Sequence, residues 1–237
     1  MPSGRAAPRG VFRWRSRVAS AAVLAALVLF GLLAWLVSSG LTARSDLALT
    51  VDLQRAQSPP LTTLMVMVSY PGYPPQSAII VLAAAGLFVL AGYRLEALFA
   101  ALAGVGAWLI ASALKQLVLR PRPEDSLVHV LGGAGGYSFP SGHVLFYVSF
   151  FGFLLYWSFA YLSQGWPRTG LIWLCGLLIA LVGPSRVYLG QHWTSDVLAA
   201  YALSLAYLLV LIRLYGAARL HAPPRRPAGS SGREQRP

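Results

Sequence analysis

Long apolar runs separated by short polar stretches dominate the chain. A helix needs about 20 apolar residues to cross the hydrocarbon core of a membrane. Six runs reach or approach that length, and they cover residues 18–37, 77–93, 97–114, 144–162, 169–181 and 197–212. The two last runs are long enough only if each helix extends into the polar stretch at its outer end. The pattern predicts an all-α polytopic membrane protein, a bundle of six transmembrane helices.

Composition supports this class. Hydrophobic residues make up 57% of the 237 residues and charged residues only 11%, whereas soluble domains have about 25% charged residues. The formal net charge is +12, and most of the arginines lie in the two terminal flanks. Cytoplasmic flanks carry such an excess, and these tails lack the folded surface on which a nucleic-acid site would present interleaved basic and aromatic residues. We therefore predict both termini in the cytoplasm, a plasma membrane location and no nucleic-acid partner.

The segments between and beyond the runs complete the expected layout. Residues 1–17 form a basic cytoplasmic tail, 18–216 the six-span domain, and 217–237 a disordered basic tail rich in Pro, Arg, Gly and Ser. Residues 38–76 form an outer loop, in which the apolar stretch 61–70 is too short to span and predicts a helix at the membrane interface or packed on the outer face. The first run exceeds the length usual for a cleaved signal peptide, so we expect a retained anchor.

Residues 185–196 contain the densest group of candidate catalytic side chains. His192 and Asp196 stand four positions apart, which on a helix places them on one face within reach of each other. The carboxylate can hold one ring nitrogen and leave the other free as a base or nucleophile. Arg186 is a permanent cation suited to a phosphate oxyanion. Because a lone His and Asp pair at this spacing is often structural, the interpretation needs support from elsewhere in the chain.

Positive charge also gathers where topology does not explain it. Lys115, Arg120 and Arg122 follow the third run on the side predicted to face outward. Snorkelling towards lipid headgroups accounts for such cations, but ionisable groups at the edge of a span are also functional candidates. With six spans, these cations lie on the same membrane face as residues 185–196.

The start of the fourth run adds an anion site at that face. Ser141 and Gly142 offer free backbone N–H groups at a helix amino-terminus, where both the donors and the helix dipole favour an anion. His143 stands directly beside them. The sequence therefore predicts that seven side chains of types that bind or transfer phosphate converge: Lys115, Arg122, Ser141, His143, Arg186, His192 and Asp196.

Together these residues resemble the three-part signature of the type 2 phosphatidic acid phosphatase superfamily, which includes vanadium-dependent haloperoxidases and bacterial acid phosphatases. The blocks are Lys115 with Arg122-Pro123 after six intervening residues, Pro140-Ser141-Gly142-His143, and Ser185-Arg186 with His192 and Asp196. Every signature position is filled. The resemblance covers about residues 115–196 by motif, and the six-span layout extends it to most of the chain.

The resemblance implies a role for each residue. His192 is the nucleophile that becomes a phosphohistidine, Asp196 holds its ring, and His143 protonates the leaving oxygen. The phosphoryl oxygens are bound by the Ser141 hydroxyl, the Gly142 amide and the cations of Lys115, Arg122 and Arg186. No cofactor or metal is expected, since family members work without one and the seven acidic residues of this chain do not cluster as a two-metal site requires.

The predicted function is that of an integral membrane lipid phosphatase. The substrate partner is a lipid phosphate or diphosphate within the bilayer; undecaprenyl diphosphate, phosphatidate and phosphatidylglycerol phosphate all suit the family, and the first is favoured by analogy. A lipid phosphotransferase with the same site and a non-catalytic lipid-binding or transport protein remain alternatives. Six spans without a large soluble domain argue against a haloperoxidase. The sequence leaves the oligomeric state open.

Overall fold

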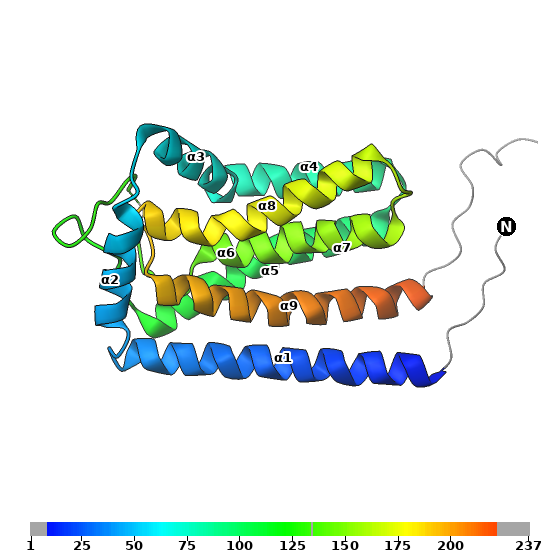
Figure 1. Cartoon of the computed structure of the whole chain (residues 1–237). Coiled ribbons are helices and arrows are strands. Elements are labelled where there is room, and N and C mark those ends of the chain that lie inside the picture. The colour runs from blue at the N-terminus through cyan, green and yellow to red at the C-terminus, as the bar shows by residue number, and fades with distance from the viewer. Residues whose placement is uncertain (1–8, 134, 222–237) are drawn as a thin grey trace, which may run out of the picture.

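The computed structural model describes residues 9–133 and 135–221, and for residues 9–16 it describes the backbone alone. In these ranges the chain is helical and forms no strand, which confirms the all-α prediction (Figure 1). A 3-10 turn at Tyr70–Gly72 follows α3, and a π-helical segment at Tyr147–Phe151 joins α6 to α7. The helices are α1 (Arg9–Ser38), α2 (Ala43–Gln54), α3 (Pro59–Ser69), α4 (Gln76–Leu90), α5 (Arg94–Val118), α6 (Gly142–Phe146), α7 (Gly152–Tyr161), α8 (Trp166–Tyr188) and α9 (Thr194–His221).

Five membrane-spanning helices have the length and hydropathy to cross a bilayer within the described ranges: α1 from Arg17, α5, the continuous α6 to α7 segment, α8 and α9. As predicted, α8 and α9 reach this length by extending into polar residues. The second predicted span is corrected. Residues 77–93 do not form one full helix, because α4 has only 15 residues; it becomes a span only together with α3, from which it is bent by 58°. Pro71, Pro74 and Pro75 separate the two helices, since proline cannot continue a hydrogen-bonded helix.

Small side chains let the helices of the bundle approach closely. On α5, Ala100, Ala103 and Ala107 are fully buried. A Cβ on Gly104 would lie 2.4 Å from the Val81 side chain of α4, so this contact depends on glycine. Such small-residue interfaces are typical of membrane helices. Large apolar side chains such as Leu82 and Leu109 point away from the bundle, as expected for a surface covered by lipid.

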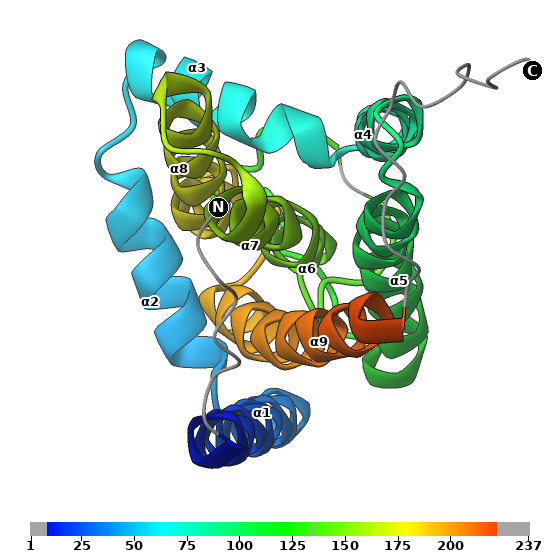
Figure 2. The ribbon, with the colours of Figure 1, turned by 90° about the vertical axis from the view of Figure 1, so that its right-hand side faces the viewer.

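The two ends of the bundle differ. In Figure 1, α2 lies across one end, whereas the start of α1 and the end of α9 lie together at the opposite end. Seen along the bundle, α1 stands outside the other spans and packs beside α9 (Figure 2). The carboxyl ends of α5 and α8 and the amino ends of α6 and α9 lie at the α2 end, together with the loop of residues 119–133 and 135–141. The chain therefore brings the predicted functional segments to one end of the bundle.

Two predicted boundaries change. The basic segment 1–17 was expected to be a tail, but α1 begins at Arg9, so its second half is helical. The disordered tail was expected from residue 217, but α9 continues to His221, because 217–221 contains no proline or glycine to end the helix. Residues 1–8 and 222–237 lie outside the described part. The apolar stretch 61–70 falls in α3 and the first residue of the 3-10 turn that follows it, and α3 packs against α8. Its relation to a membrane interface stays a prediction.

Candidate active site

A cavity of about 340 Å³ opens where the ends of α5, α6 and α8 meet. Six of the eight predicted residues line it. The helix ends contribute Lys115 from the last turn of α5, Gly142 and His143 from the start of α6, and Arg186 from the last turn of α8. Arg122 and His192 come from the connecting segments, whereas Ser141 and Asp196 are buried behind the wall. Residues separated by up to 77 positions are thus gathered around one space, as the sequence predicted.

His192 does not lie on a helix, which corrects the expected geometry. It stands in the turn between α8 and α9, and only Asp196 is helical, in the first turn of α9. The turn requires Gly190, whose φ is +64° and whose added Cβ would lie 2.2 Å from the His129 carbonyl oxygen. A left-handed residue packed against another backbone has no room for a side chain. The turn nevertheless brings the side chains of His192 and Asp196 together. The predicted pair is therefore found, but the chain forms it through a turn and not along one face of a helix.

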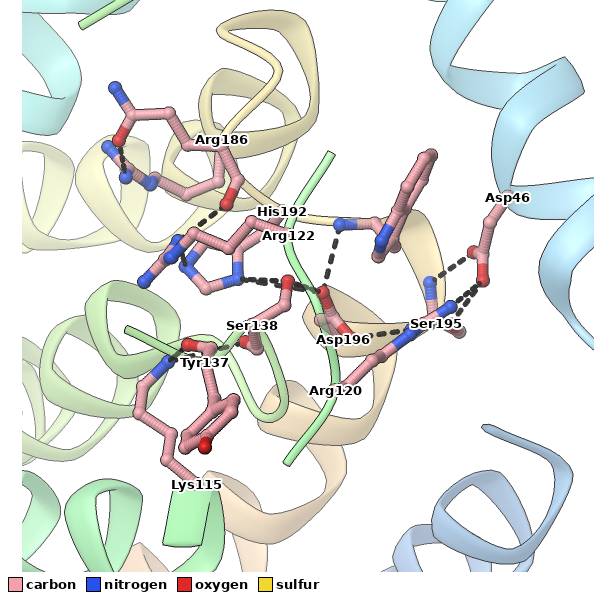
Figure 3. A network of polar contacts seen from close by, with 12 residues as sticks. Asp46, Lys115, Arg120, Arg122, Tyr137, Ser138, Arg186, His192, Ser195 and Asp196 are labelled. Carbon is pink, nitrogen blue, oxygen red and sulfur yellow. Dashed lines mark hydrogen bonds and ion pairs between the residues drawn. The ribbon is translucent and has the colours of Figure 1, made fainter. Parts of the chain in front are cut away.

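The contacts of His192 define its tautomer (Figure 3). Nη1 of Arg122 lies 3.2 Å from Nε2 of the ring, and because a guanidinium can only donate, Nε2 must be the acceptor. The proton then sits on Nδ1, which faces the Ser138 hydroxyl at 3.4 Å and the nearer Asp196 oxygen at 3.6 Å. Nε2 therefore has a lone pair on the side of Arg122 and the cavity, as a nucleophile requires.

The surroundings keep this ring neutral. Burial lowers the pKa of His192 well below its usual value of 6.5, and the neighbouring cations of Arg122, Lys115 and Arg186 lower it further. Both causes disfavour the imidazolium form, because one removes water and the other adds like charge. At neutral pH the ring therefore has the unprotonated Nε2 that attack on phosphorus needs.

Asp196 is fully buried, and the structure accounts for both of its oxygens. Oδ1 accepts a hydrogen bond from Arg120 Nη1 at 2.6 Å. Oδ2 accepts from the Trp193 N–H at 2.9 Å and from the Ser138 hydroxyl. Ser138 is thus placed between the carboxylate and the ring, so that Asp196 orients His192 partly through this hydroxyl rather than by one direct hydrogen bond.

The cations of the cavity are held mainly by carbonyl oxygens and other neutral acceptors. Lys115 donates to the Tyr137 carbonyl, and Arg122 donates to those of Gly136 at 3.1 Å and Gln191 at 2.6 Å. Burial, followed by the charge of Arg186, lowers the pKa of Arg122, although a guanidinium remains protonated. Among the described residues that line the cavity, none is acidic. An anion would relieve the repulsion among these positive groups.

Some polar atoms of the site have no protein partner. His143 Nε2, Arg186 Nε and Ser141 Oγ are buried and form no hydrogen bond within the described structure. Buried polar atoms are nearly always paired, so such atoms in a cavity wall suggest a ligand. His143 and Arg186 line the cavity directly, and His143 is placed to exchange a proton with a group bound there.

The structure adds residues that the sequence did not single out as functional. Tyr73, from the break between α3 and α4, donates to Gln191 Oε1 at 2.9 Å and accepts from Arg186 Nη1 at 2.9 Å. Its ring meets that of His143 edge-on, with 4.5 Å between centroids. Ser138 lies in the long loop. Nothing in their spacing distinguishes these residues, and tertiary contacts alone place them at the site.

A metal would need a different donor set. Over the described ranges, no three His, Cys, Asp or Glu side chains come together as a group that could hold a metal ion. The chemistry of the cavity wall, three cations and two imidazoles, suits an anion instead. Independence from metal remains a prediction that an assay with chelator must test.

Comparison with known proteins identifies the family. The sequence model of the PAP2 superfamily matches residues 95–220, more than half of the chain and the whole of the site apart from Tyr73 and its neighbours. The chain belongs to the PAP2 superfamily. This confirms the resemblance seen in the three sequence blocks and, with the helical bundle, shows a polytopic membrane protein of that superfamily.

Characterised relatives cover only part of this PAP2 protein. Phosphatidylglycerophosphatase B of Bacillus subtilis (strain 168) is 33% identical over 99 residues, 41% of this chain and 47% of that protein. Phosphatidylglycerophosphatase B of Escherichia coli (strain K12) is 34% identical over 95 residues, 39% of this chain and 34% of that protein. The aligned segment thus spans less than half the length of these relatives.

Solved structures share the fold over a larger part. The crystal structure of a transmembrane PAP2 type phosphatidylglycerolphosphate phosphatase from Bacillus subtilis matches with a TM-score of 0.71 at 24% identity, covering 86% of this chain and 98% of that one. Aquifex aeolicus LpxE matches with a TM-score of 0.57 at 20% identity over 70% of this chain and 94% of that one. At these identities the likeness shows a common fold.

Proposed function

We propose that this protein is a metal-independent lipid phosphatase that hydrolyses the phosphate or diphosphate headgroup of a membrane lipid through a phosphohistidine intermediate. The observation that carries the proposal is the unprotonated Nε2 of His192, facing a cavity lined by three cations and a second histidine with an unpaired Nε2. The named relatives, phosphatidylglycerophosphatases, act on a lipid phosphate, which supports the same substrate class here.

The residues divide the reaction into two steps. In the first, His192 Nε2 forms a bond to phosphorus while the bond to the leaving oxygen breaks. His143, which the bound anionic headgroup favours in its protonated form, gives that oxygen a proton. In the second, His143 takes a proton from water, whose oxygen displaces His192 and releases phosphate. Lys115, Arg122 and Arg186 stabilise the charge on the equatorial phosphoryl oxygens, the main source of catalysis in phosphoryl transfer.

An apolar groove next to the cavity favours a lipid over a soluble phosphate ester. The groove, of about 550 Å³, lies between α4 and α5 and is lined by Val81, Leu82, Val105 and Leu109 among others. Pro74 and Trp108 belong to the walls of both spaces. A polar cavity that continues into an apolar groove fits a molecule with a charged headgroup and a hydrocarbon tail.

The first test is phosphate release by the purified protein in detergent with chelator present. Phosphatidylglycerol phosphate, phosphatidate, a polyprenyl diphosphate and a soluble phosphomonoester form the panel, each measured beside His192→Ala. We expect release from at least one lipid, reduced at least 1,000-fold by the substitution, since removal of a catalytic nucleophile costs about 10⁶ in kcat. Acid-labile, base-stable labelling by ³²P-lipid in a rapid quench would identify the phosphohistidine. Release that survives in His192→Ala would contradict the mechanism.

We also propose that the cavity lies on the extracytoplasmic side of the plasma membrane, on the basis of the basic flanks at the opposite end. The free cysteine Cys175 is buried, so an introduced cysteine can be read with little background. Arg55→Cys, at the exposed end of α2, should react with an impermeant maleimide in intact cells. Arg94→Cys, exposed at the opposite end, should react only after permeabilisation; the reverse pattern would invert the topology.

A further inference from the structure

Asp46 of α2 is buried at the start of α9, although 149 positions separate it from its partner there. Only 2% of its surface is exposed. Oδ1 accepts the Ser195 backbone N–H at 2.8 Å, and Oδ2 accepts the Ser195 hydroxyl at 2.7 Å. Ser195 is the second residue of α9, so its N–H has no acceptor within the helix. The carboxylate therefore caps α9 from another helix, at the end where the helix dipole favours negative charge.

This cap is one residue away from the carboxylate that faces the nucleophile. Asp196 follows Ser195 in the same helical turn, and it in turn accepts the Trp193 N–H, the reach-back of a capping box. The position of the Asp196 side chain thus depends on how the first turn of α9 is held. Asp46 holds that turn from outside, at its backbone and at a side chain.

Arg120 connects the two carboxylates. Its Nη1 donates to Asp196 Oδ1 at 2.6 Å and its Nη2 to Asp46 Oδ2 at 2.6 Å, while its side chain is 11% exposed (Figure 3). One cation is thus shared between two buried anions. Without the charge of Asp46, the whole of the Arg120 cation would act on Asp196.

The sharing of the Arg120 charge between Asp46 and Asp196 matters when the nucleophile reacts. As His192 Nε2 bonds to phosphorus, the ring, still protonated at Nδ1, becomes cationic and draws stabilisation from Asp196. An Arg120 that is not compensated by Asp46 would weaken this stabilisation in the low-dielectric interior, where nearby charges interact strongly. Asp46 does not line the cavity, so the binding of the headgroup should not depend on it.

We propose that Asp46 is a positioning residue for the phosphotransfer step: it fixes the first turn of α9 and balances Arg120, so that Asp196 is aligned and charged to stabilise His192 during attack. This inference rests on the proposed function. Helix α2 lies across the end of the bundle and precedes the matched PAP2 region. The proposal gives this helix a part in the chemistry, in addition to covering the site.

The test compares Asp46→Asn, which keeps the shape of the side chain and removes its charge, with Asp52→Asn on the same helix. Asp52 forms an exposed pair with Arg55 and serves as the matched control. For Asp46→Asn we expect kcat to fall about 10- to 100-fold, the cost of losing a buried hydrogen bond to a charged group. KM and the inhibition constant of inorganic phosphate should stay within about 2-fold, as for an interaction that matters only in the transition state. Asp52→Asn should match wild type in all three.

A second variant covers the case in which Asp46→Asn does not fold. Ser195→Ala removes one hydroxyl contact with Asp46 and one with Arg120 and leaves the backbone cap in place, so kcat should fall by a smaller factor, about 3- to 10-fold, again without change in KM. Folding is checked by size exclusion and thermal unfolding.

The outcomes separate the two proposals. Unchanged kcat in a folded Asp46→Asn, or in Ser195→Ala where the first does not fold, overturns the role of Asp46 alone. An equal loss in kcat and in phosphate affinity overturns it too, because that pattern means general distortion of the cavity. No lipid phosphate release by wild type overturns the proposed function and this inference with it.

Discussion

In the proposed mechanism, the hydrogen bond between Arg122 and His192 would link phosphate binding to activation of the nucleophile. Nη1 of Arg122 donates a hydrogen bond to the lone pair of His192 Nε2, with 3.2 Å between the two nitrogens. The same guanidinium also donates to two backbone carbonyls in the loop. A phosphate in the cavity is a stronger acceptor than a neutral imidazole. Bound headgroup would therefore draw Arg122 to itself and free Nε2 for attack.

Arg122→Gln tests this double role. The substitution removes a charge-assisted donor to the phosphoryl oxygens, and removal of one such donor costs about 10²- to 10³-fold in kcat. We expect kcat/KM for the lipid substrate to fall by at least that factor. Arg55→Gln, at an exposed arginine of α2, is the control and should leave kcat/KM unchanged. A loss confined to KM would show that Arg122 only binds the substrate.

The neutral state of His192 predicts how its reactivity depends on pH. Diethyl pyrocarbonate modifies only unprotonated imidazole, and the pKa of His192 is lowered by burial and by Arg122, Lys115 and Arg186. A lowered pKa keeps the neutral form present at lower pH, so inactivation should be half-maximal below pH 6.5, whereas N-acetylhistidine reacts half-maximally near its usual value of about 6.5. The measurement uses His129→Gln/His221→Gln and follows modification of His192 itself by mass spectrometry of its peptide, because His143 lines the same cavity; inorganic phosphate should protect. Inactivation that titrates at or above pH 6.5 would contradict a neutral, buried His192.

For individual residues, the sequence predicted those of the signature and missed the residues that hold them in position. Six of the eight predicted residues line one cavity. They could be predicted because they belong to a signature whose residue types and spacing can be recognised in a sequence. Ser138, Tyr73 and Gln191 have no such pattern. Each lies in a loop or turn and reaches the site through a tertiary contact, such as the Ser138 hydroxyl that touches both Asp196 and His192.

Among the elements, the break between α3 and α4 forms part of the cavity wall. Gly72, Tyr73 and Pro74 line it, and Gly72 lies so close to His143 that an added Cβ would be 2.3 Å from the ring atom Cδ2. The break thus places backbone directly against the proposed proton donor. Its glycine is needed for this approach rather than for an unusual backbone angle, since Gly72 is absent from the positive-φ residues of the described chain.

Gly72→Ala should therefore impair catalysis more than stability. A methyl group there must displace His143, and a shift of about 1 Å in a reacting group costs about 100-fold in rate. We expect a kcat lower by that order, measured by phosphate release. Gly86→Ala on α4, where an added Cβ meets nothing within 4 Å, is the control and should keep full activity. Equal activity of the two variants would mean that His143 is free to move without loss.

The same break shows why one element was mispredicted. Hydropathy alone gave one apolar run at 77–93, and the preceding apolar stretch at 61–70 was separated from it by three prolines. The bend of 58° depends on α3 packing against α8, and α4 against α5; no local pattern contains this information. Helix α2 was likewise missed, because its charged residues are typical of a loop. Its helix is stabilised by tertiary contacts that bury Asp46 and Thr50, and the sequence alone does not show these contacts.

For the whole molecule, the position of the apolar groove relative to the cavity supports the proposed substrate class. The groove lies between α4 and α5 and is open on its outer side, where Leu82 and Leu109 are among the exposed residues. A lipid lying in the bilayer can insert its tail there while its headgroup reaches the cavity past Pro74 and Trp108. A soluble ester would use the cavity alone.

Val105→Trp tests whether a lipid substrate places its tail in the groove. Val105 lines the groove and is absent from the cavity wall, so an indole there should fill tail space and leave the phosphate site intact. Loss of apolar contact worth about 1.5 to 3 kcal/mol predicts a KM for long-chain lipid phosphate about 10- to 100-fold higher, with unchanged kcat/KM for a soluble phosphomonoester. Leu98→Trp, at an exposed position of the same helix outside the groove, controls for the added indole. A parallel loss on both substrates would place the damage in the cavity, and no loss on either would mean that the tail lies elsewhere on the bundle.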